Sequence, residues 1–215
     1  MRRAENRQND YCRLCDALSG RLAEGHMRRC DTVLYRTPSF VLLPAIGPLC
    51  VGHAMVVSRK HFASLATMPE SAILEYDDLI QTLLRLSAIS GNLLEAEHGG
   101  TTDDLGGGCI AHTHINILPG LATLADLFSP PLDSLSTFRN LSEIKEVSHP
   151  YIMIRSGGAV ATTFKAHGLP SQCIRRILAL QLGSPHWNWR TAPEPDVIES
   201  TITFWKAALG HGHLA

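Results

Sequence analysis

The chain has 215 residues, of which 45% are hydrophobic and 18% are charged, so it can bury one sizeable core with an extension but is short for two full-sized domains. Its 19 Lys and Arg balance 20 Asp and Glu, which argues against a nucleic-acid polymer or a polybasic membrane contact. The longest apolar runs are too short to cross a bilayer and the start lacks the apolar segment of a signal peptide, so we expect no membrane contact and a soluble, cytoplasmic protein.

The first half of the chain reads as a short tail followed by an antiparallel meander. Residues 1–10 are polar and without apolar periodicity, which is typical of a disordered tail, and structure should begin at Tyr11. Three short apolar or β-branched runs follow at residues 32–36, 39–44 and 53–58. Because Gly and Pro separate these runs, they predict three strands joined by turns.

A long helix and further strands should complete the first domain. Thr67 can cap a helix with Pro69 and Glu70 in its first turn, and apolar residues then recur at helical spacing up to Gly91. A fourth strand is expected at residues 92–97, and a fifth at 109–118 after a loop rich in Gly and Asp. We therefore expect an α+β fold, with an antiparallel sheet of about five strands and a long helix on one face.

The remaining residues predict a smaller C-terminal α/β extension. Residues 121–149 read as irregular with one or two short helices, and residues 151–155 and 159–164 as a hairpin. Two helices at residues 171–182 and 195–209 should end the chain. The expected division is a tail at 1–10, a domain at 11–120 and an extension at 121–215.

The fifth predicted strand carries the polar groups of most interest. Alternation along a strand places Ile115 and Ile117 on one face and His112, His114 and Asn116 on the other. A solvated polar face is the simplest explanation for such a row. Two histidines and an Asn that follow a Gly-rich loop favour a functional site instead.

Two segments together resemble the histidine triad family of nucleotide hydrolases and transferases. The segment His112-Thr-His-Ile-Asn-Ile-Leu-Pro119 resembles that family's H-x-H-x-H signature, and Gly52-His53 to Lys60-His61 resembles its other motif, in the same order and spacing. The resemblance implies a nucleotide-binding domain over residues 11–120. It also implies that His114 attacks the α-phosphorus of a nucleotide, giving a nucleotidyl-histidine intermediate.

The third position of the signature is Asn116 rather than histidine. An amide can donate to a phosphate oxygen but cannot pass a proton to a leaving group. The resemblance then implies a nucleotidyl hydrolase or transferase acting on a phosphoanhydride, phosphoramidate or nucleotide-sugar bond, with His114 and Asn116 as catalytic residues. The alternatives are a nucleotide-binding protein without turnover and a tailoring enzyme for an unusual nucleotide conjugate.

Cys12 and Cys15 form the one close cysteine pair of the sequence. Such a pair serves either a redox site or a metal site, and no strand precedes it here as in thioredoxin-like proteins. A structural zinc ion needs four ligands. The resemblance implies that Cys12, Cys15, His61 and His112 hold structural Zn²⁺, which leaves His114 as the reactive imidazole.

Weaker signals surround this pattern. The resemblance puts His53 and His98 near the substrate, although either could equally be a buried histidine of the fold. Gly107 and Gly108 could let the backbone approach a phosphate, and with Cys109 they complete the expected substrate-binding residues, although a flexible loop is the simpler reading. Gln172, Arg175 and Arg176 could put polar groups and positive charge at a helix start near an anion, although a solvated helix face is the simpler reading of the two arginines. Trp187 and Trp189 read as core aromatics. Sheet joining between two copies, as in that family, implies a homodimer, unless the extension supplies this contact within one chain.

Overall fold

The structure is a computed structural model that describes residues 12–21, 27–100, 110–128 and 132–210. The predicted tail at residues 1–10 and the expected start at Tyr11 lie outside the described residues. The first described elements are two short helices, α1 (Arg13–Leu18) and α2 (Met27–Cys30).

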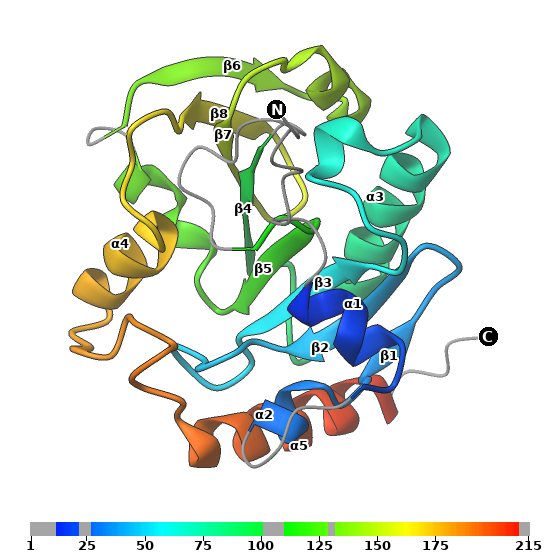
Figure 1. Cartoon of the computed structure of the whole chain (residues 1–215), viewed down its shortest axis with the longest axis vertical. Coiled ribbons are helices and arrows are strands. Elements are labelled where there is room, and N and C mark those ends of the chain that lie inside the picture. Colours follow the sequence, from blue (N-terminus) through cyan, green and yellow to red (C-terminus); the bar gives the residue numbers. More distant parts are fainter. Residues whose placement is uncertain (1–11, 22–26, 101–109, 129–131, 211–215) are drawn as a thin grey trace, which may run out of the picture.

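An antiparallel sheet forms the centre of the molecule (Figure 1). Its strand order is β1-β2-β3-β5-β4-β7-β8-β6, and every neighbouring pair is antiparallel. The strands are β1 (Tyr35–Arg36), β2 (Phe40–Pro44), β3 (Ala54–Ser58), β4 (Leu93–Gly99), β5 (His114–Pro119), β6 (Ser134–Phe138), β7 (Tyr151–Ser156) and β8 (Ala161–Lys165). The α+β fold is confirmed, but the sheet of the described residues has eight strands rather than about five.

The three additional strands come from the predicted extension. Strand β7 pairs with β4 along its whole length, from Leu94 opposite Ser156 to Gly99 opposite Tyr151. The expected hairpin of β7 and β8 is confirmed, and β6 joins it at the edge. The prediction that residues 121–149 hold no strand is wrong for β6, which is mostly exposed and therefore lacks the apolar alternation of a half-buried strand.

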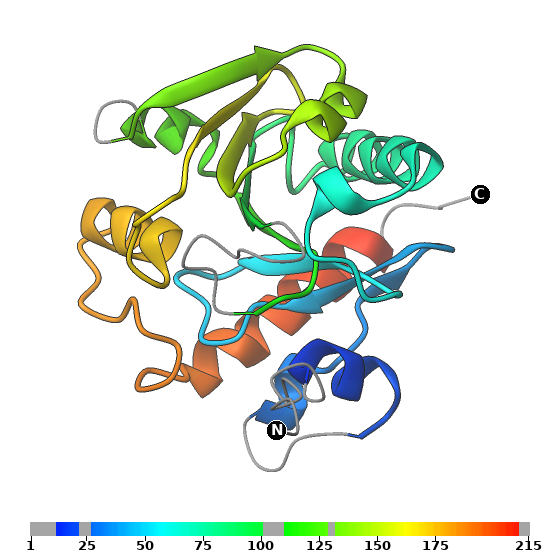
Figure 2. The same ribbon diagram turned by 45° about the horizontal axis from the view of Figure 1, so that its top comes forward.

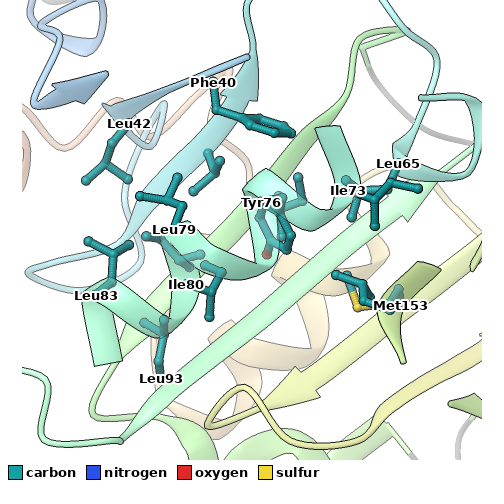
Figure 3. Packing of buried hydrophobic residues seen from close by; sticks show 14 of the residues in the cluster. Phe40, Leu42, Leu65, Ile73, Tyr76, Leu79, Ile80, Leu83, Leu93 and Met153 are labelled. Carbon is teal, nitrogen blue, oxygen red and sulfur yellow. The ribbon is translucent and has the colours of Figure 1, made fainter. Parts of the chain in front are cut away.

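The long helix α3 (Glu70–Leu84) covers one face of the sheet, as predicted (Figure 3). Its buried residues Ile73, Tyr76 and Ile80 pack against sheet residues that include Phe40 and Leu93. The helix begins later than expected and has no side-chain cap. Thr67 instead ends a short 3-10 helix, η1 (Leu65–Thr67), where its hydroxyl donates to the carbonyl oxygen of Ser64.

Four helices lie toward the opposite face of the sheet. Helix α4 (Cys173–Gln181) packs on residues of β4, β5 and β7, whereas α1, α2 and the first half of α5 (Pro195–Gly210) pack on β2 and β3. The end of α5 joins the cluster under α3 through Trp205 and Ala208. Figure 2 shows α5 running beneath these last strands. The 3-10 helices η2 (Ala122–Phe128) and η3 (Leu141–Glu146) complete the fold. Two apolar clusters thus share this face, and the site lies where they meet.

Within the described part of the chain, no helix combines the length and apolarity that crossing a membrane requires.

Candidate functional site

Strand β5 divides its side chains between the two faces of the sheet as the sequence predicts. Ile115 and Ile117 pack in the cluster under α3. His114 and Asn116 point the other way and line a cavity. His112 precedes the strand and is buried beside the N-terminal cysteines. Pairing with β3 on one side and β4 on the other makes β5 an inner strand, so its side chains have fixed positions.

The cavity contains about 580 Å³ of empty space, counting the part that is open to solvent. Its apolar part comes from both clusters of this face. The described lining residues are Ala45, Ile46, Met55, His98, Ile110, His114, Asn116, Gln172, Ile174, Arg175 and Trp189. Apolar walls with a few converging polar groups are typical of small-molecule sites.

The backbone determines which nitrogen of His114 carries the proton. Nδ1 lies 2.7 Å from the carbonyl oxygen of His112. Because a carbonyl oxygen only accepts, Nδ1 must be the donor, and in the neutral ring Nε2 keeps its lone pair. Burial lowers the pKa of His114. The ring is therefore neutral at pH 7, with a nucleophilic nitrogen at Nε2.

His53 determines the orientation of the Asn116 amide in a similar way. The backbone N–H of Leu49 donates to Nδ1 of His53 at 3.1 Å, so the neutral ring carries its proton on Nε2. That Nε2 lies 3.1 Å from Oδ1 of Asn116 and donates to it. Nδ2 of Asn116 in turn donates to the carbonyl oxygen of Ala96 at 3.3 Å. One N–H of the Asn116 amide is thus used within the fold, and no described residue accepts from its second N–H.

His53 is 1% exposed and does not line the cavity. Burial, and secondarily the positive charge of Arg175, lower the pKa of His53 to about 3. The ring is therefore neutral over the physiological range. The structure places His53 behind Asn116, whereas His98, at the end of β4, lines the cavity itself.

The four residues predicted to hold zinc come together. One ligand atom from each of Cys12, Cys15, His61 and His112 lies within 4.8 Å of the other three. Nδ1 of His112 is 3.3 Å from Sγ of Cys12 and 3.4 Å from Sγ of Cys15, and Nδ1 of His61 is 3.4 Å from Sγ of Cys15. Sulfur and nitrogen ligands of a tetrahedral zinc ion lie roughly 3.5 Å apart. The cluster has the composition and spacing to hold a metal ion.

The His112 side chain is already held from its other side. Nε2 donates to the carbonyl oxygen of Ser58 at 2.7 Å, which leaves Nδ1 unprotonated toward the sulfur atoms. Burial lowers the pKa of His112 to about 4, so the ring is neutral, as a metal ligand must be. Since the carbonyl oxygen of His112 also accepts from His114, the cysteine and histidine cluster adjoins His114 through one residue.

Gly107, Gly108 and Cys109, which were also predicted to bind substrate, lie outside the described residues.

Two further polar residues of the cavity, Gln172 and Arg175, come from the start of α4. Arg175 is 8% exposed, so the expectation of a solvated face is wrong for this residue, whereas Arg176 is exposed and stacks on Trp187. Arg175 lies three residues before the buried Leu178, a spacing that puts both on one helix face. That spacing was the available signal. Trp189 packs partly against the core, as expected, but also lines the cavity.

No protein-family model matches the chain, and no curated protein matches it. Solved structures do show a likeness. One is titled a hypothetical histidine triad nucleotide-binding protein from Sulfolobus tokodaii strain7, at 23% identity over 50% of this chain and 68% of that chain, with a TM-score of 0.38. Another is a Zn-bound histidine triad family protein from Mycobacterium smegmatis, at 22% identity over 50% and 73%, with a TM-score of 0.36.

A third is a HIT family hydrolase from Clostridium thermocellum, at 17% identity over 52% of this chain and 91% of that chain, with a TM-score of 0.38. The solved structures to which this chain is similar therefore include histidine triad proteins, over about half of its length.

Proposed function

We propose that this chain is a nucleotidyl hydrolase or transferase in which His114 forms a covalent bond to the α-phosphorus of a nucleotide. One observation carries the proposal: an imidazole held in its Nδ1–H form by the carbonyl oxygen of His112 lines a cavity beside a neutral amide donor. A buried, neutral imidazole with an available lone pair is a nucleophile near pH 7. The motif spacing of the sequence supports the same assignment.

The reaction proceeds in two balanced steps. First, the lone pair of Nε2 attacks phosphorus, so an Nε2–P bond forms while the bond to the leaving group breaks and that group departs with its electron pair. The ring then gains positive charge, and the carbonyl oxygen of His112 stabilises the Nδ1–H that carries part of it. Second, an oxygen of water or another acceptor attacks phosphorus, the Nε2–P bond breaks, and the proton of the acceptor passes to solvent.

Asn116 acts in this proposal as the hydrogen-bond donor to a phosphate oxygen of the ligand. Its Oδ1 accepts from His53 and one N–H donates to Ala96, so the second N–H of Nδ2 is the group assigned to a phosphate oxygen. His53 is then a positioning residue, because it acts through Asn116. The amide cannot protonate a leaving group, so the reaction favours leaving groups that depart as stable anions, such as phosphates.

The cysteine and histidine cluster holds a structural zinc ion in this proposal. Two thiolates and two neutral imidazoles are an ordinary ligand set for tetrahedral zinc. Cys12, Cys15, His61 and His112 would hold the ion, which supplies cross-linking and no chemistry at phosphorus. Because the backbone of His112 orients His114, fixing this residue keeps the nucleophile in its reactive tautomer.

Mass spectrometry of the intact protein tests the proposal. The zinc-loaded chain is mixed with a panel of nucleoside polyphosphates, nucleotide sugars and nucleoside phosphoramidates, and the added mass of one nucleotide is sought. We expect it in the wild-type chain and in His149→Ala, the control at an exposed histidine outside the cavity, and its loss in His114→Ala. Labelling that survives in His114→Ala would contradict the proposal.

The second candidate is a nucleotide-binding protein without turnover. The neutral amide at Asn116 favours it, because no proton donor for the leaving group stands at this position. Binding of a nucleoside monophosphate with no mass added from any nucleotide of the panel would support this candidate and reject the first. A tailoring enzyme for an unusual nucleotide conjugate stays the third prediction.

A further inference from the structure

Residues that follow the last strand supply a separate wall of the cavity. Gln172, Ile174 and Arg175 come from the beginning of α4, and Trp189 comes from the turn between α4 and α5. They face His114 and Asn116 of β5 across the same space. A ligand bound in this cavity would therefore contact a segment more than 50 residues beyond β5.

Hydrogen bonds hold this wall in place. Gln172 has a positive φ of 62°, a conformation that costs energy in a residue other than glycine and persists where the surroundings require it. Its side chain donates to Oδ1 of Asn188 at 3.0 Å and accepts from the backbone N–H of Trp189 at 3.2 Å. Gln172 thereby ties the start of α4 to the turn that carries the Trp189 ring.

Arg175 ties the same wall to the turn between β2 and β3. Its Nε donates to the carbonyl oxygen of Trp187 at 2.7 Å, and its Nη2 donates to the carbonyl oxygen of Gly47. Gly47 has a φ of 57°, and a Cβ there would lie 2.6 Å from the carbonyl oxygen of Ala192. The two chain segments are therefore in close contact, and the guanidinium has a fixed position at the side of the cavity.

Arg175 also brings formal charge to the cavity. Among the described residues that line it, Arg175 is the one Arg, Lys, Asp or Glu. Asn116 and Gln172 are neutral amides. A phosphate that reacts at His114 carries negative charge, and the charge that develops on its oxygens during transfer needs a fixed cation or donor.

We propose that Arg175 binds an oxygen of the ligand phosphate, so that the C-terminal segment makes this cavity selective for anionic ligands. This role deepens the proposed function, on which it rests for the position of the phosphate, but it requires binding alone. A planar guanidinium suits phosphate better than an ammonium group does, because it presents paired N–H donors.

Titration calorimetry with matched ligands tests this assignment. The full-length zinc-loaded chain and its variants are titrated with AMP and adenosine, with GMP and guanosine, and with inorganic phosphate. We expect the wild-type chain to bind the monophosphates more tightly than the nucleosides. Arg175→Gln should weaken monophosphate binding by about 10- to 100-fold, the range for losing a hydrogen bond to a charged group, with nucleoside affinity unchanged.

Arg176→Gln is the matched control, because the neighbouring arginine is exposed and stacks on Trp187. Its monophosphate affinity should equal that of the wild-type chain. Arg175→Lys keeps the charge but loses the planar fork, so we expect a smaller loss than in Arg175→Gln. Zinc content and melting temperature report whether each variant folds, and Arg175→Lys decides the question if Arg175→Gln does not.

Three results would overturn the assignment. They are equal binding of nucleoside and monophosphate by the wild-type chain, unchanged monophosphate affinity in a folded Arg175 variant, and no binding of the monophosphates or of inorganic phosphate. Arg175-dependent monophosphate binding without any covalent adduct at His114 would support the assignment while rejecting nucleotidyl transfer. The two proposals therefore fail in distinguishable ways.

Discussion

Two substitutions at His53 distinguish its role in positioning the Asn116 amide from its contribution to the stability of the fold. Asn places its oxygen where Nδ1 of the imidazole lies, so His53→Asn keeps an acceptor for Leu49 and loses the donor to Asn116. Gln places its nitrogen where Nε2 lies, so His53→Gln keeps the donor and loses the acceptor. Each variant leaves at least one buried polar group unpaired, Oδ1 of Asn116 in His53→Asn and the N–H of Leu49 in His53→Gln, which costs about 1–3 kcal/mol per group.

The two variants should be similarly destabilised and differ in function. In His53→Asn the amide of Asn116 is no longer held, so we expect the rate of adduct formation at His114 to fall by about tenfold or more, as for the loss of one positioned hydrogen bond. In His53→Gln the rate should stay within about threefold of wild type. Urea unfolding and rapid-quench mass spectrometry measure the two quantities. Equal rates in the two variants would refute the positioning role.

The difference in stability between the wild-type chain and these variants should also depend on pH in a defined direction. The pKa of His53 falls from 6.5 to about 3 on folding, because the protein buries the ring. The folded state therefore resists protonation, and its stability is complete above pH 6.5 and is lost as the pH falls toward 3. From pH 7 to pH 5 the wild-type chain should lose about 2 kcal/mol through this group, at about 1.4 kcal/mol per pKa unit. The deficit of either variant should shrink by that amount, and a constant deficit would contradict the burial of a neutral imidazole.

Two further predictions concern the buried carboxyl group of Glu97 and the metal ion. Burial raises the pKa of Glu97 from 4.5 to about 7, so its contribution to stability is complete below pH 4.5 and falls as the pH rises to 7. Between pH 5 and pH 7, the free energy of unfolding of Glu97→Gln should therefore rise by about 2 kcal/mol relative to that of the wild-type chain, as measured by urea unfolding. A fall relative to wild type would contradict the burial of Glu97. Cys15→Ser should lose zinc by elemental analysis and at least about 3 kcal/mol of stability, the effect of a ligand present at a hundredfold over its Kd, while Cys50→Ser, outside the cluster, keeps its zinc. Equal zinc content in these two variants would reject the proposed ligand set.

Local patterns in the sequence predicted the parts of the site that lie on one strand or one turn. Period-two alternation assigned Ile115 to the helix side and His114 to the cavity side, and the structure agrees. The cysteine spacing indicated a metal or redox pair, and the resemblance put Cys12 and His112 in one set of metal ligands. The structure places their side chains in contact. Strand alternation succeeds because strand geometry fixes the direction of each side chain, whereas the set of metal ligands came from the family resemblance.

Features that depend on distant packing were beyond the sequence. Strand β6 has an exposed, polar pattern, because it lies at the sheet edge and pairs with β8 alone. The hydrogen bond from His53 to Asn116 joins residues that are 63 positions apart. Arg175 has the charge of a surface residue, but it is buried because its guanidinium donates hydrogen bonds to the carbonyl oxygens of Gly47 and Trp187. Hydrogen-bond partners that are far apart in the sequence, like these, are identified only from the three-dimensional structure.

The proposed covalent bond to phosphorus forms at one nitrogen atom, Nε2 of His114. Nuclear magnetic resonance of the trapped intermediate, prepared from chain labelled with nitrogen-15 in its histidines, identifies the nitrogen bonded to phosphorus through its coupling to phosphorus-31. We predict a coupling at Nε2 of His114, with Nδ1 still protonated toward the carbonyl oxygen of His112. A bond at Nδ1, or at any other histidine, would contradict it.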